Sequence, residues 1–185
     1  QRQMCIRDRS DHMEYVLGCL SASTAHVHMI LEPSDVEGLL LTMRSIWNIY
    51  SKRWMKRDAV VLNERILIVQ RSKLGEEHPY VALSLNNIGL VLSDLGKKQE
   101  ALSYFEQSLT IRKKVYGHEH IVVAGSLNSI GNVLYNLCKY QEALSYYQQS
   151  LTIRKKLYGH EHTDVATSLN NIGLVLSDLG KKQEA

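Results

Sequence analysis

The feature that most constrains this chain is an internal repeat with a period of 42 residues. The nine residues S-L-N-N-I-G-L-V-L at 84–92 return unchanged at 168–176, and S-L-N-S-I-G-N-V-L occupies the same register at 126–134. A period of this length is typical of an array in which one small supersecondary unit is stacked many times. The chain is therefore expected to form a repeat architecture and not a single domain with one closed core.

The repeat divides the chain of 185 residues. Residues 79–120 and 121–162 agree at 30 of 42 positions, whereas 37–78 agrees with 79–120 at only ten. The chain stops within the pattern, so further repeats are expected C-terminal to Ala185 in the full-length protein. The expected units are a divergent repeat at 37–78, full repeats at 79–120 (repeat one) and 121–162 (repeat two), and a truncated repeat with only its first helix at 163–185 (repeat three).

Residues 1–36 carry no repeat. Gln3-Met4-Cys5-Ile6-Arg7-Asp8 resembles the translation of a DNA-library adapter, so we interpret residues 1 to about 9 as a sequencing artefact. A natural disordered terminus is the alternative. The rest of 1–36 mixes small, polar and apolar residues without a sustained period, and we interpret it as an unstructured or undetermined connector.

Each unit has the pattern of two helices. Apolar residues in the first helix of repeat one recur at spacings of three and four, which places them on one helix face. Gly89, Gly131 and Gly173 stand inside the first helices of repeats one, two and three, where glycine costs about 1 kcal/mol relative to alanine. We expect close approach of the second helix, with Ala101, Ala143 and Ala185 opposite, to offset this cost. The apolar positions are Val81, Leu85, Ile88, Leu92 and Leu95 in the first helix, and Ala101, Leu102, Phe105, Leu109 and Val115 in the second.

The helix ends also have sequence signals. Gly96 and Gly180 favour a stop after the first helix, because glycine accepts the left-handed conformation found there. Cys138 replaces that glycine in repeat two, so the same turn is not assured there. Arg112 and its neighbours follow in the last turn of the second helix, where cations complement the carbonyl end of the helix dipole.

These spacings resemble the tetratricopeptide repeat. The 42-residue length, the L-N-N-I-G segment and the Y-G-H-E-H linker are similar to the long-repeat branch of kinesin light chains and nephrocystin-type proteins. The resemblance is strong over 79–185 and weak over 37–78. It implies an all-α fold, a right-handed superhelical solenoid of antiparallel helix pairs, of which this chain is a fragment. The matching residues are Leu85, Gly89, Leu92, Gly96, Lys98, Ala101 and Phe105 in repeat one, and Leu127, Gly131, Leu134, Tyr140, Ala143 and Tyr147 in repeat two.

Composition and motifs favour a protein without catalytic chemistry. No phosphate-binding glycine loop, C-x-x-C, H-E-x-x-H or G-x-S-x-G sequence is present, so we predict neither an enzyme nor a bound cofactor. The His118-Glu119-His120 cluster could ligate zinc, but helix capping by the linker histidines is the favoured interpretation. Three scattered cysteines and the lack of an apolar run of about 20 residues favour a cytoplasmic protein without membrane insertion.

The net charge of +3 is too small to indicate a nucleic-acid binder. Short basic runs recur with the repeat, but they fall at helix ends and bring no aromatic platform for bases. We therefore expect a protein or peptide partner and no nucleic acid.

The resemblance locates the binding surface. In stacked tetratricopeptide repeats the first helix of each pair lines a concave groove, and asparagines there hold an extended peptide by its main chain. The groove has no lysine or arginine clamp for a terminal carboxylate, and repeat two differs from its neighbours chiefly on this face, with Tyr135 as the expected anchor. The groove candidates are Asn86, Asn87, Leu90 and Ser93 in repeat one, Asn128, Asn132, Tyr135 and Asn136 in repeat two, and Asn170, Asn171, Leu174 and Ser177 in repeat three.

The sequence is compatible with three functions. The first is a non-enzymatic scaffold that binds an extended peptide in this groove. The second is a regulatory or sensor tail of a larger signalling NTPase whose catalytic domain is missing from the sequence. Nucleic-acid binding is the least favoured. A phosphate-binding loop in upstream sequence would favour the NTPase, and a coiled coil there would favour a motor adaptor.

Overall fold

A computed structural model describes the backbone of residues 56–184 and the side chains of residues 59–180. The expectations for 1–36, and for the first part of the divergent repeat 37–78, lie outside the described residues. The chain forms two compact units, Gln1–Val69 and Gln70–Ala185, and the division falls within one helix.

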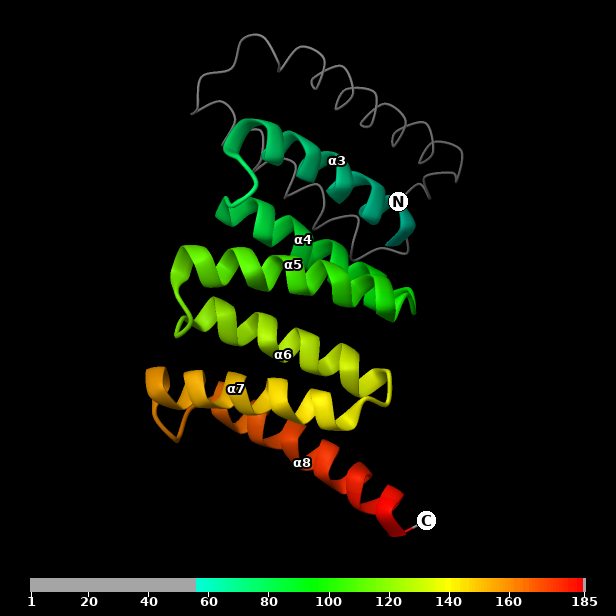
Figure 1. Ribbon diagram of the computed structural model, residues 1–185, viewed down its shortest axis with the longest axis vertical. Helices are drawn as coiled ribbons and strands as arrows, with labels where there is room; N and C mark the ends of the chain where they lie inside the picture. The colour runs from blue at the N-terminus through cyan, green and yellow to red at the C-terminus, as the bar shows by residue number, and fades with distance from the viewer. Residues whose placement is uncertain (1–55, 185) are drawn as a thin grey trace, which may run out of the picture. The chain divides into compact units, whose positions relative to one another are not determined.

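All regular structure in the described residues is helical (Figure 1). The helices are α3 (Lys56–Leu74), α4 (Pro79–Asp94), α5 (Lys98–Tyr116), α6 (Ile121–Asn136), α7 (Tyr140–Tyr158) and α8 (Thr163–Glu184). Helix α3 begins in the first unit and ends in the second, and the other five helices belong to the second unit.

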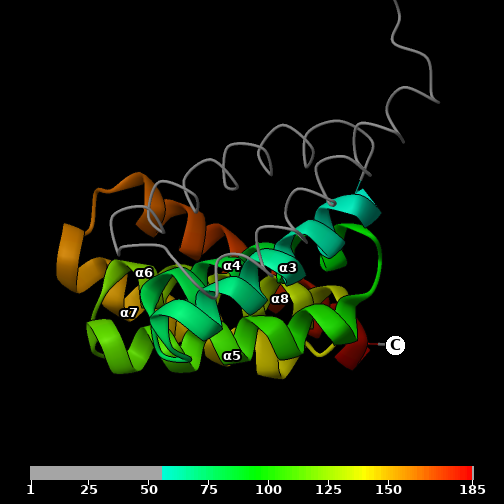
Figure 2. The ribbon, with the colours of Figure 1, turned by 90° about the horizontal axis from the view of Figure 1, so that it is seen from above.

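Within the second unit, each helix from α4 to α8 packs against the next one along the chain. Short turns connect them, so successive helices are antiparallel and follow one another along the stack (Figure 1). Seen from above, α5 lies along one side of the stack and α4 and α6 along the other (Figure 2). The expected helix pairs are therefore α4–α5 in repeat one and α6–α7 in repeat two, with α8 alone in repeat three.

The core of each pair is formed by the predicted apolar faces, except that Val115 in the last turn of α5 is 41% exposed. Val81, Leu85 and Ile88 of α4 are at most 1% exposed, and Phe105 of α5 is 1% exposed. Each fully buried side chain of this size contributes about 1.5–3 kcal/mol. Because no helix buries its apolar face alone, the pairs are held together mainly by this contact.

The glycines inside the first helices do allow close approach, but the expected neighbours were wrong. A Cβ placed on Gly89 would lie 2.9 Å from the ring of Phe105, and one on Gly131 would lie 2.7 Å from the ring of Tyr147. The nearest atoms are thus aromatic side chains, not Ala101 and Ala143. An aromatic ring beside the glycine fills the space that a methyl group would need.

The turn after the first helix is the same in both complete repeats. Gly96 has φ 80° and Cys138 has φ 59°, and the amide of each donates to the carbonyl three residues earlier. Cys138 therefore adopts the glycine conformation despite its side chain. The expected stop at Gly180 was wrong, since α8 continues through it to Glu184. No second helix packs on α8 within the described residues, so nothing there requires the turn.

The linker histidines cap the first helices, as the favoured sequence interpretation predicted. The imidazole Nδ1 of His78, His120 and His162 accepts a hydrogen bond from the backbone N–H two residues later, at 3.1–3.2 Å. Tyr116 stacks on His120 with ring centroids 4.7 Å apart, and Tyr158 stacks on His162 at 4.1 Å. Each tyrosine at the end of one helix thereby holds the cap of the next helix in place.

Candidate functional site

The twelve groove candidates lie on α4, α6 and α8, the first helices of the three repeats. None of them is fully buried, so this side of the helices is accessible. We call this surface the amide face. The exposed members are Leu90, Asn132, Asn136, Asn170, Leu174 and Ser177, and the half-buried members are Asn86, Asn87, Ser93, Asn128, Tyr135 and Asn171.

An arginine from the second helix of repeat one connects α4 to α6. The guanidinium of Arg112 donates to the Ser126 hydroxyl at 2.7 Å, to the Val122 carbonyl at 3.5 Å, and to Oδ1 of Asn86 at 3.4 Å. Arg112 is only 8% exposed, and burial lowers its pKa. The charge is held by neutral oxygens from both helices, so this contact fixes repeat one to repeat two.

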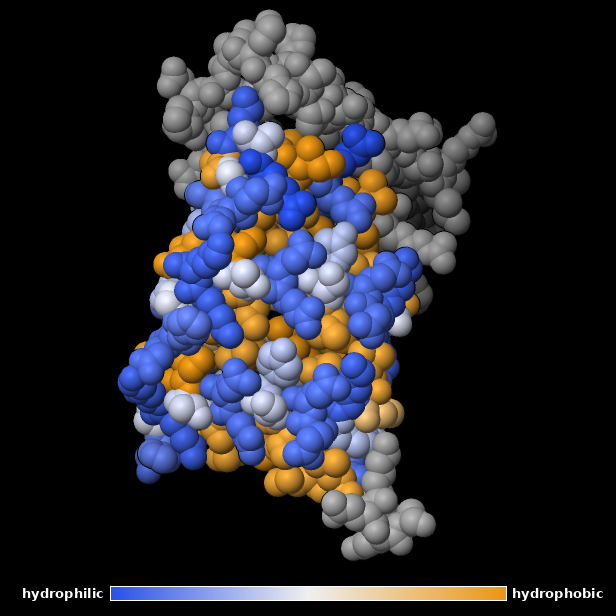
Figure 3. All heavy atoms as spheres, viewed as in Figure 1, coloured by the Kyte–Doolittle hydropathy of each residue, from blue (hydrophilic) through white to orange (hydrophobic). Residues whose placement is uncertain are grey.

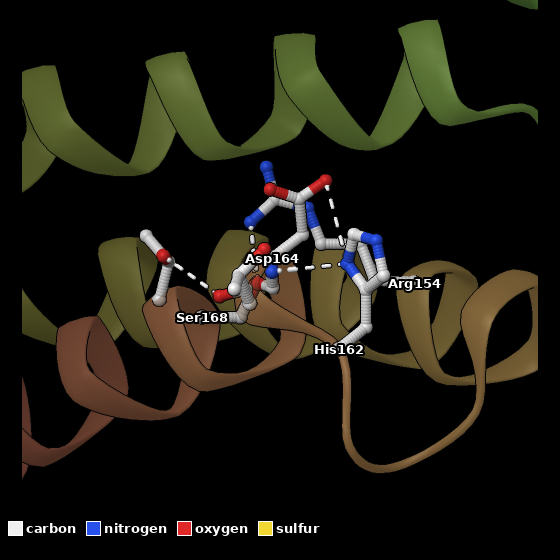
Figure 4. Close-up of polar contacts among 6 residues, drawn as sticks. Arg154, His162, Asp164 and Ser168 are labelled. Carbon is white, nitrogen blue, oxygen red and sulfur yellow. Dashed lines mark hydrogen bonds and ion pairs between the residues drawn. The ribbon is translucent and has the colours of Figure 1, made fainter.

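Repeat two has the corresponding contacts to the serine and the backbone carbonyl, but not the contact to the asparagine (Figure 4). Arg154 of α7 donates to the Ser168 hydroxyl at 2.8 Å and to the Asp164 carbonyl at 3.0 Å. The backbone N–H of Asp164 also donates to the capping ring of His162. The end of α7 and the start of α8 are therefore held by one polar cluster.

Direct side-chain contacts also cross the amide face between repeats two and three. Nδ2 of Asn171 donates to Oδ1 of Asn128 at 3.1 Å, and the Tyr135 hydroxyl donates to Asp178 at 2.7 Å. The Asp178 carboxylate stabilises the protonated phenol, which raises the pKa of Tyr135. The structure thus brings together three of the candidates, Asn128, Tyr135 and Asn171, at this junction.

Asn132 is tied to the core of its own repeat. The hydroxyl of Tyr147, a residue that is 2% exposed, donates to Oδ1 of Asn132 at 2.7 Å. Burial raises the pKa of Tyr147 to about 12. In repeat one the equivalent residues are Leu90 and Phe105, which need no such bond.

The other candidates show no contacts of this kind with one another. Within the described residues, the side chains of Asn87, Ser93, Asn136, Asn170 and Ser177 form no hydrogen bond with another side chain, and Leu90 and Leu174 have no polar side-chain group. The peptide carbonyl of Asn136 accepts a hydrogen bond from Lys98 at 2.8 Å. These side chains remain available on the surface.

Charged and metal-binding chemistry is sparse among the described residues. Lys114 forms an ion pair with Glu77 and Lys156 with Glu119, so these lysines face the preceding linker. No three histidine, cysteine, aspartate or glutamate side chains there are placed to hold a metal ion. None of the described helices has the length and apolarity that crossing a membrane requires.

Sequence reasoning missed the polar contacts made by the second helices. Arg112 was assigned to the helix dipole, but it is buried and bridges helices. The hydroxyls of Ser108 and Ser150 donate to the carbonyls of Ala82 and Ala124 at 2.7 and 2.8 Å. The signal was present, because both arginines and their serine partners recur at the 42-residue interval.

The fold and the repeated helix-to-helix contacts define a stack of paired helices built from one unit. Two family models described as "Tetratricopeptide repeat" match the chain, one over residues 81–121 and the other over residues 122–185. Together they cover more than half of the sequence. The protein belongs to the tetratricopeptide-repeat family, and its fold is an all-α solenoid.

Solved structures support the same fold. A Podosopora anserina protein described as a kinesin light chain with nearly identical TPR-like repeats matches with TM-score 0.71 and 24% identity, over 84% of this chain and 72% of that chain. BtubC from P. vanneervenii matches with TM-score 0.75 and 20% identity, over 97% of this chain and 71% of that chain. The TPR2AB domain of yeast Sti1, in complex with pHSP90, gives 0.62 and 18%, over 80% and 50%. No curated protein sequence matches this chain.

Proposed function

We propose that this protein is a non-enzymatic interaction scaffold that binds an extended segment of a partner protein along the amide face. Its membership of the tetratricopeptide-repeat family supports a role in protein interaction. The TPR2AB domain of Sti1, which shares the fold, forms a complex with pHSP90.

The observation that carries the proposal is the orientation of the asparagine amides. Arg112 can only donate, so Asn86 must present its carbonyl oxygen to it. The oxygens of Asn128 and Asn132 are likewise occupied by internal donors. Among the described residues, the Nδ2 groups of these three asparagines make no hydrogen bond.

This arrangement suits a main chain in extended form. Each Nδ2 group can donate to a peptide carbonyl, which needs a partner once it leaves water. Leu90 and Leu174 are 45% and 49% exposed on the same face and offer contact for apolar side chains. The amide face therefore combines hydrogen-bond donors of fixed orientation with exposed apolar side chains, a composition typical of binding sites.

Tyr135 distinguishes repeat two from its neighbours, which have serine at this position. It is half-buried, and its ring lies 5.5 Å from that of Tyr140, centroid to centroid. We assign it as the anchor that sets specificity, since aromatic residues dominate binding hot spots. A ligand that engages the hydroxyl would compete with Asp178 for it.

The test starts from a peptide library selected on the intact chain. Peptides recovered from it are titrated calorimetrically against the wild type, Asn86→Ala/Asn128→Ala and Tyr135→Ala. We expect affinity to fall at least tenfold in the double variant and in Tyr135→Ala. A matched control is Gln107→Ala/Gln149→Ala, which removes two exposed amides from α5 and α7 and leaves affinity unchanged.

Circular dichroism must show the same helix content in every variant. If the selected peptides bind the asparagine double variant as tightly as the wild type, the amide face is not the binding site. If the control variant loses affinity as strongly, the peptides bind the second helices and the assignment fails as well.

A further inference from the structure

The two junctions between consecutive repeats differ in charge. At the first junction Lys98 of repeat one donates to the peptide carbonyl of Asn136 in repeat two, at 2.8 Å. At the second junction the equivalent positions hold Tyr140 and Asp178. A cation and a neutral amide are thus replaced by a neutral phenol and a carboxylate. The formal charge of this pair of positions changes from +1 at the first junction to −1 at the second.

Two tyrosine rings lie beside the carboxylate at the second junction. The ring centroids of Tyr135 and Tyr140 are 5.5 Å apart with their planes at 49°, and the Tyr135 hydroxyl donates to Asp178 at 2.7 Å. All three residues are half-buried, so solvent reaches them. We call these three residues the tyrosine–aspartate cluster. The first junction has no counterpart, because Ser93 stands at the position of Tyr135.

This combination of groups suits a cationic side chain. A carboxylate has about four lone-pair sites, so Asp178 can keep the Tyr135 hydroxyl and still accept charge-assisted hydrogen bonds from a cation. The face of a tyrosine ring attracts a cation that lies within about 6 Å of the ring centroid. A guanidinium satisfies both groups at once, since it is planar, stacks on aromatic rings and binds a carboxylate through two parallel N–H groups. Arginine is therefore favoured over lysine.

The charges that flank the two junctions are balanced in the same way. Lys139, next to Tyr140 in the sequence, forms an ion pair with Glu142 at 3.5 Å, and Lys97 forms the equivalent pair with Glu100 at 3.1 Å. The junctions therefore differ at the cluster itself and not in its flanks. Polar surface alone does not mark the place, because Figure 3 shows hydrophilic residues spread along the described part of the stack on the face in view.

We propose that the tyrosine–aspartate cluster binds an arginine side chain of the partner segment. The guanidinium pairs with the Asp178 carboxylate and lies against the rings of Tyr135 and Tyr140, so the partner supplies at the second junction the cation that Lys98 supplies at the first. This inference rests on the proposed function, since the cluster lies on the amide face, and it names the residue type that repeat two selects. Arginine is also a residue that recurs among binding hot spots.

Selection of a random heptapeptide library on the intact chain provides the first test. We expect arginine at one fixed position of the recovered peptides. Citrulline at that position keeps the shape of the side chain and removes its charge, and we expect it to lower the affinity measured by calorimetry at least tenfold. The arginine and citrulline peptides should bind Asp178→Asn with similar affinity. Recovered peptides without a preferred arginine overturn the inference.

Two variants control for charge and for position. Asp94 has in repeat one the register of Asp178, so Asp94→Asn removes the same charge, and we expect the full discrimination against citrulline to persist. Tyr140→Lys installs the residue of repeat one at the cluster and should abolish that discrimination. Circular dichroism establishes that the variants retain the wild-type helix content. Discrimination that survives Asp178→Asn, or that Asp94→Asn also removes, contradicts the assignment.

The asparagine double variant Asn86→Ala/Asn128→Ala separates this inference from the proposed function. If that variant weakens binding while the arginine and citrulline peptides bind the wild type alike, the inference fails and the proposed function stands. If neither the two asparagines nor Asp178 affects binding, both fail.

Discussion

The two glycines at 89 and 173 lie in identical nine-residue segments, yet replacing each with alanine should have opposite effects. Alanine gains about 1 kcal/mol of helix propensity over glycine at either position. At Gly89 the new methyl group would lie 2.9 Å from Cε1 of Phe105 and 3.0 Å from Cδ1 and Cζ. Because that ring is 1% exposed, it has no free space to move into.

Overpacking a core in this way costs about 1–3 kcal/mol. After the propensity gain, Gly89→Ala should be neutral to about 2 kcal/mol less stable than the wild type. At Gly173 nothing lies within 4 Å, so Gly173→Ala should keep the gain of about 1 kcal/mol. The two variants should therefore differ by about 1–3 kcal/mol, which is the packing cost alone.

Urea unfolding followed by far-ultraviolet circular dichroism measures this difference. Phe105→Leu, alone and with Gly89→Ala, completes a double-mutant cycle, because a smaller side chain relieves the contact. We expect the cost of Gly89→Ala to shrink in the Phe105→Leu background. If Gly89→Ala and Gly173→Ala shift the midpoint equally, or if the cycle shows no coupling, the aromatic ring is not what requires glycine at position 89.

Three further predictions concern repeat two. Burial raises the pKa of Tyr147 to about 12. The stabilisation that follows from this shift is therefore full below the ordinary tyrosine pKa near 10 and is lost as the pH rises toward 12. Tyr147→Phe should reduce the fall in the free energy of unfolding measured across that pH range. His120→Ala removes a helix cap and should cost about 1 kcal/mol in thermal unfolding, whereas His120→Asn should retain most of the stability. Cys138 carries a side chain at φ 59°, so Cys138→Gly removes backbone strain and should stabilise the protein by up to about 1 kcal/mol. Gly96→Ala at the equivalent position of repeat one should destabilise the protein. Equal unfolding midpoints for the two variants would contradict the strain argument.

The helix pairs could be predicted from the sequence because their signals are local. The spacing of apolar residues, the glycine at the turn and the histidine before each first helix depend on neighbours a few residues away, and in repeat one all three form as predicted. The 42-residue period then predicts that the helix pairs stack, because similar units bury equivalent apolar faces against one another. Where the structure differs from expectation, the cause is a contact between distant parts of the chain.

Arg112 shows this limit. Its position at the end of α5 is that of a cation at the carbonyl end of a helix, and local reasoning stops there. The structure buries it because Asn86 and Ser126, 26 and 14 residues away, meet at the same point between α4 and α6. Gly180 shows the converse, because a residue suited to a turn remains helical where no second helix of its own repeat follows within the described residues.

The differences between repeats one and two are coupled, and this changes how the amide face must be tested. Asn132 replaces Leu90 on the surface, and Tyr147 replaces Phe105 in the core, and the two new polar groups satisfy each other at 2.7 Å. Asn132→Leu alone would leave a buried hydroxyl without its acceptor, at a cost of about 1–3 kcal/mol that has nothing to do with binding. Asn132→Leu with Tyr147→Phe restores the pair found in repeat one and should recover that stability. Only the double variant therefore isolates what Asn132 contributes to a bound peptide, and a loss of affinity that persists in it belongs to the amide face.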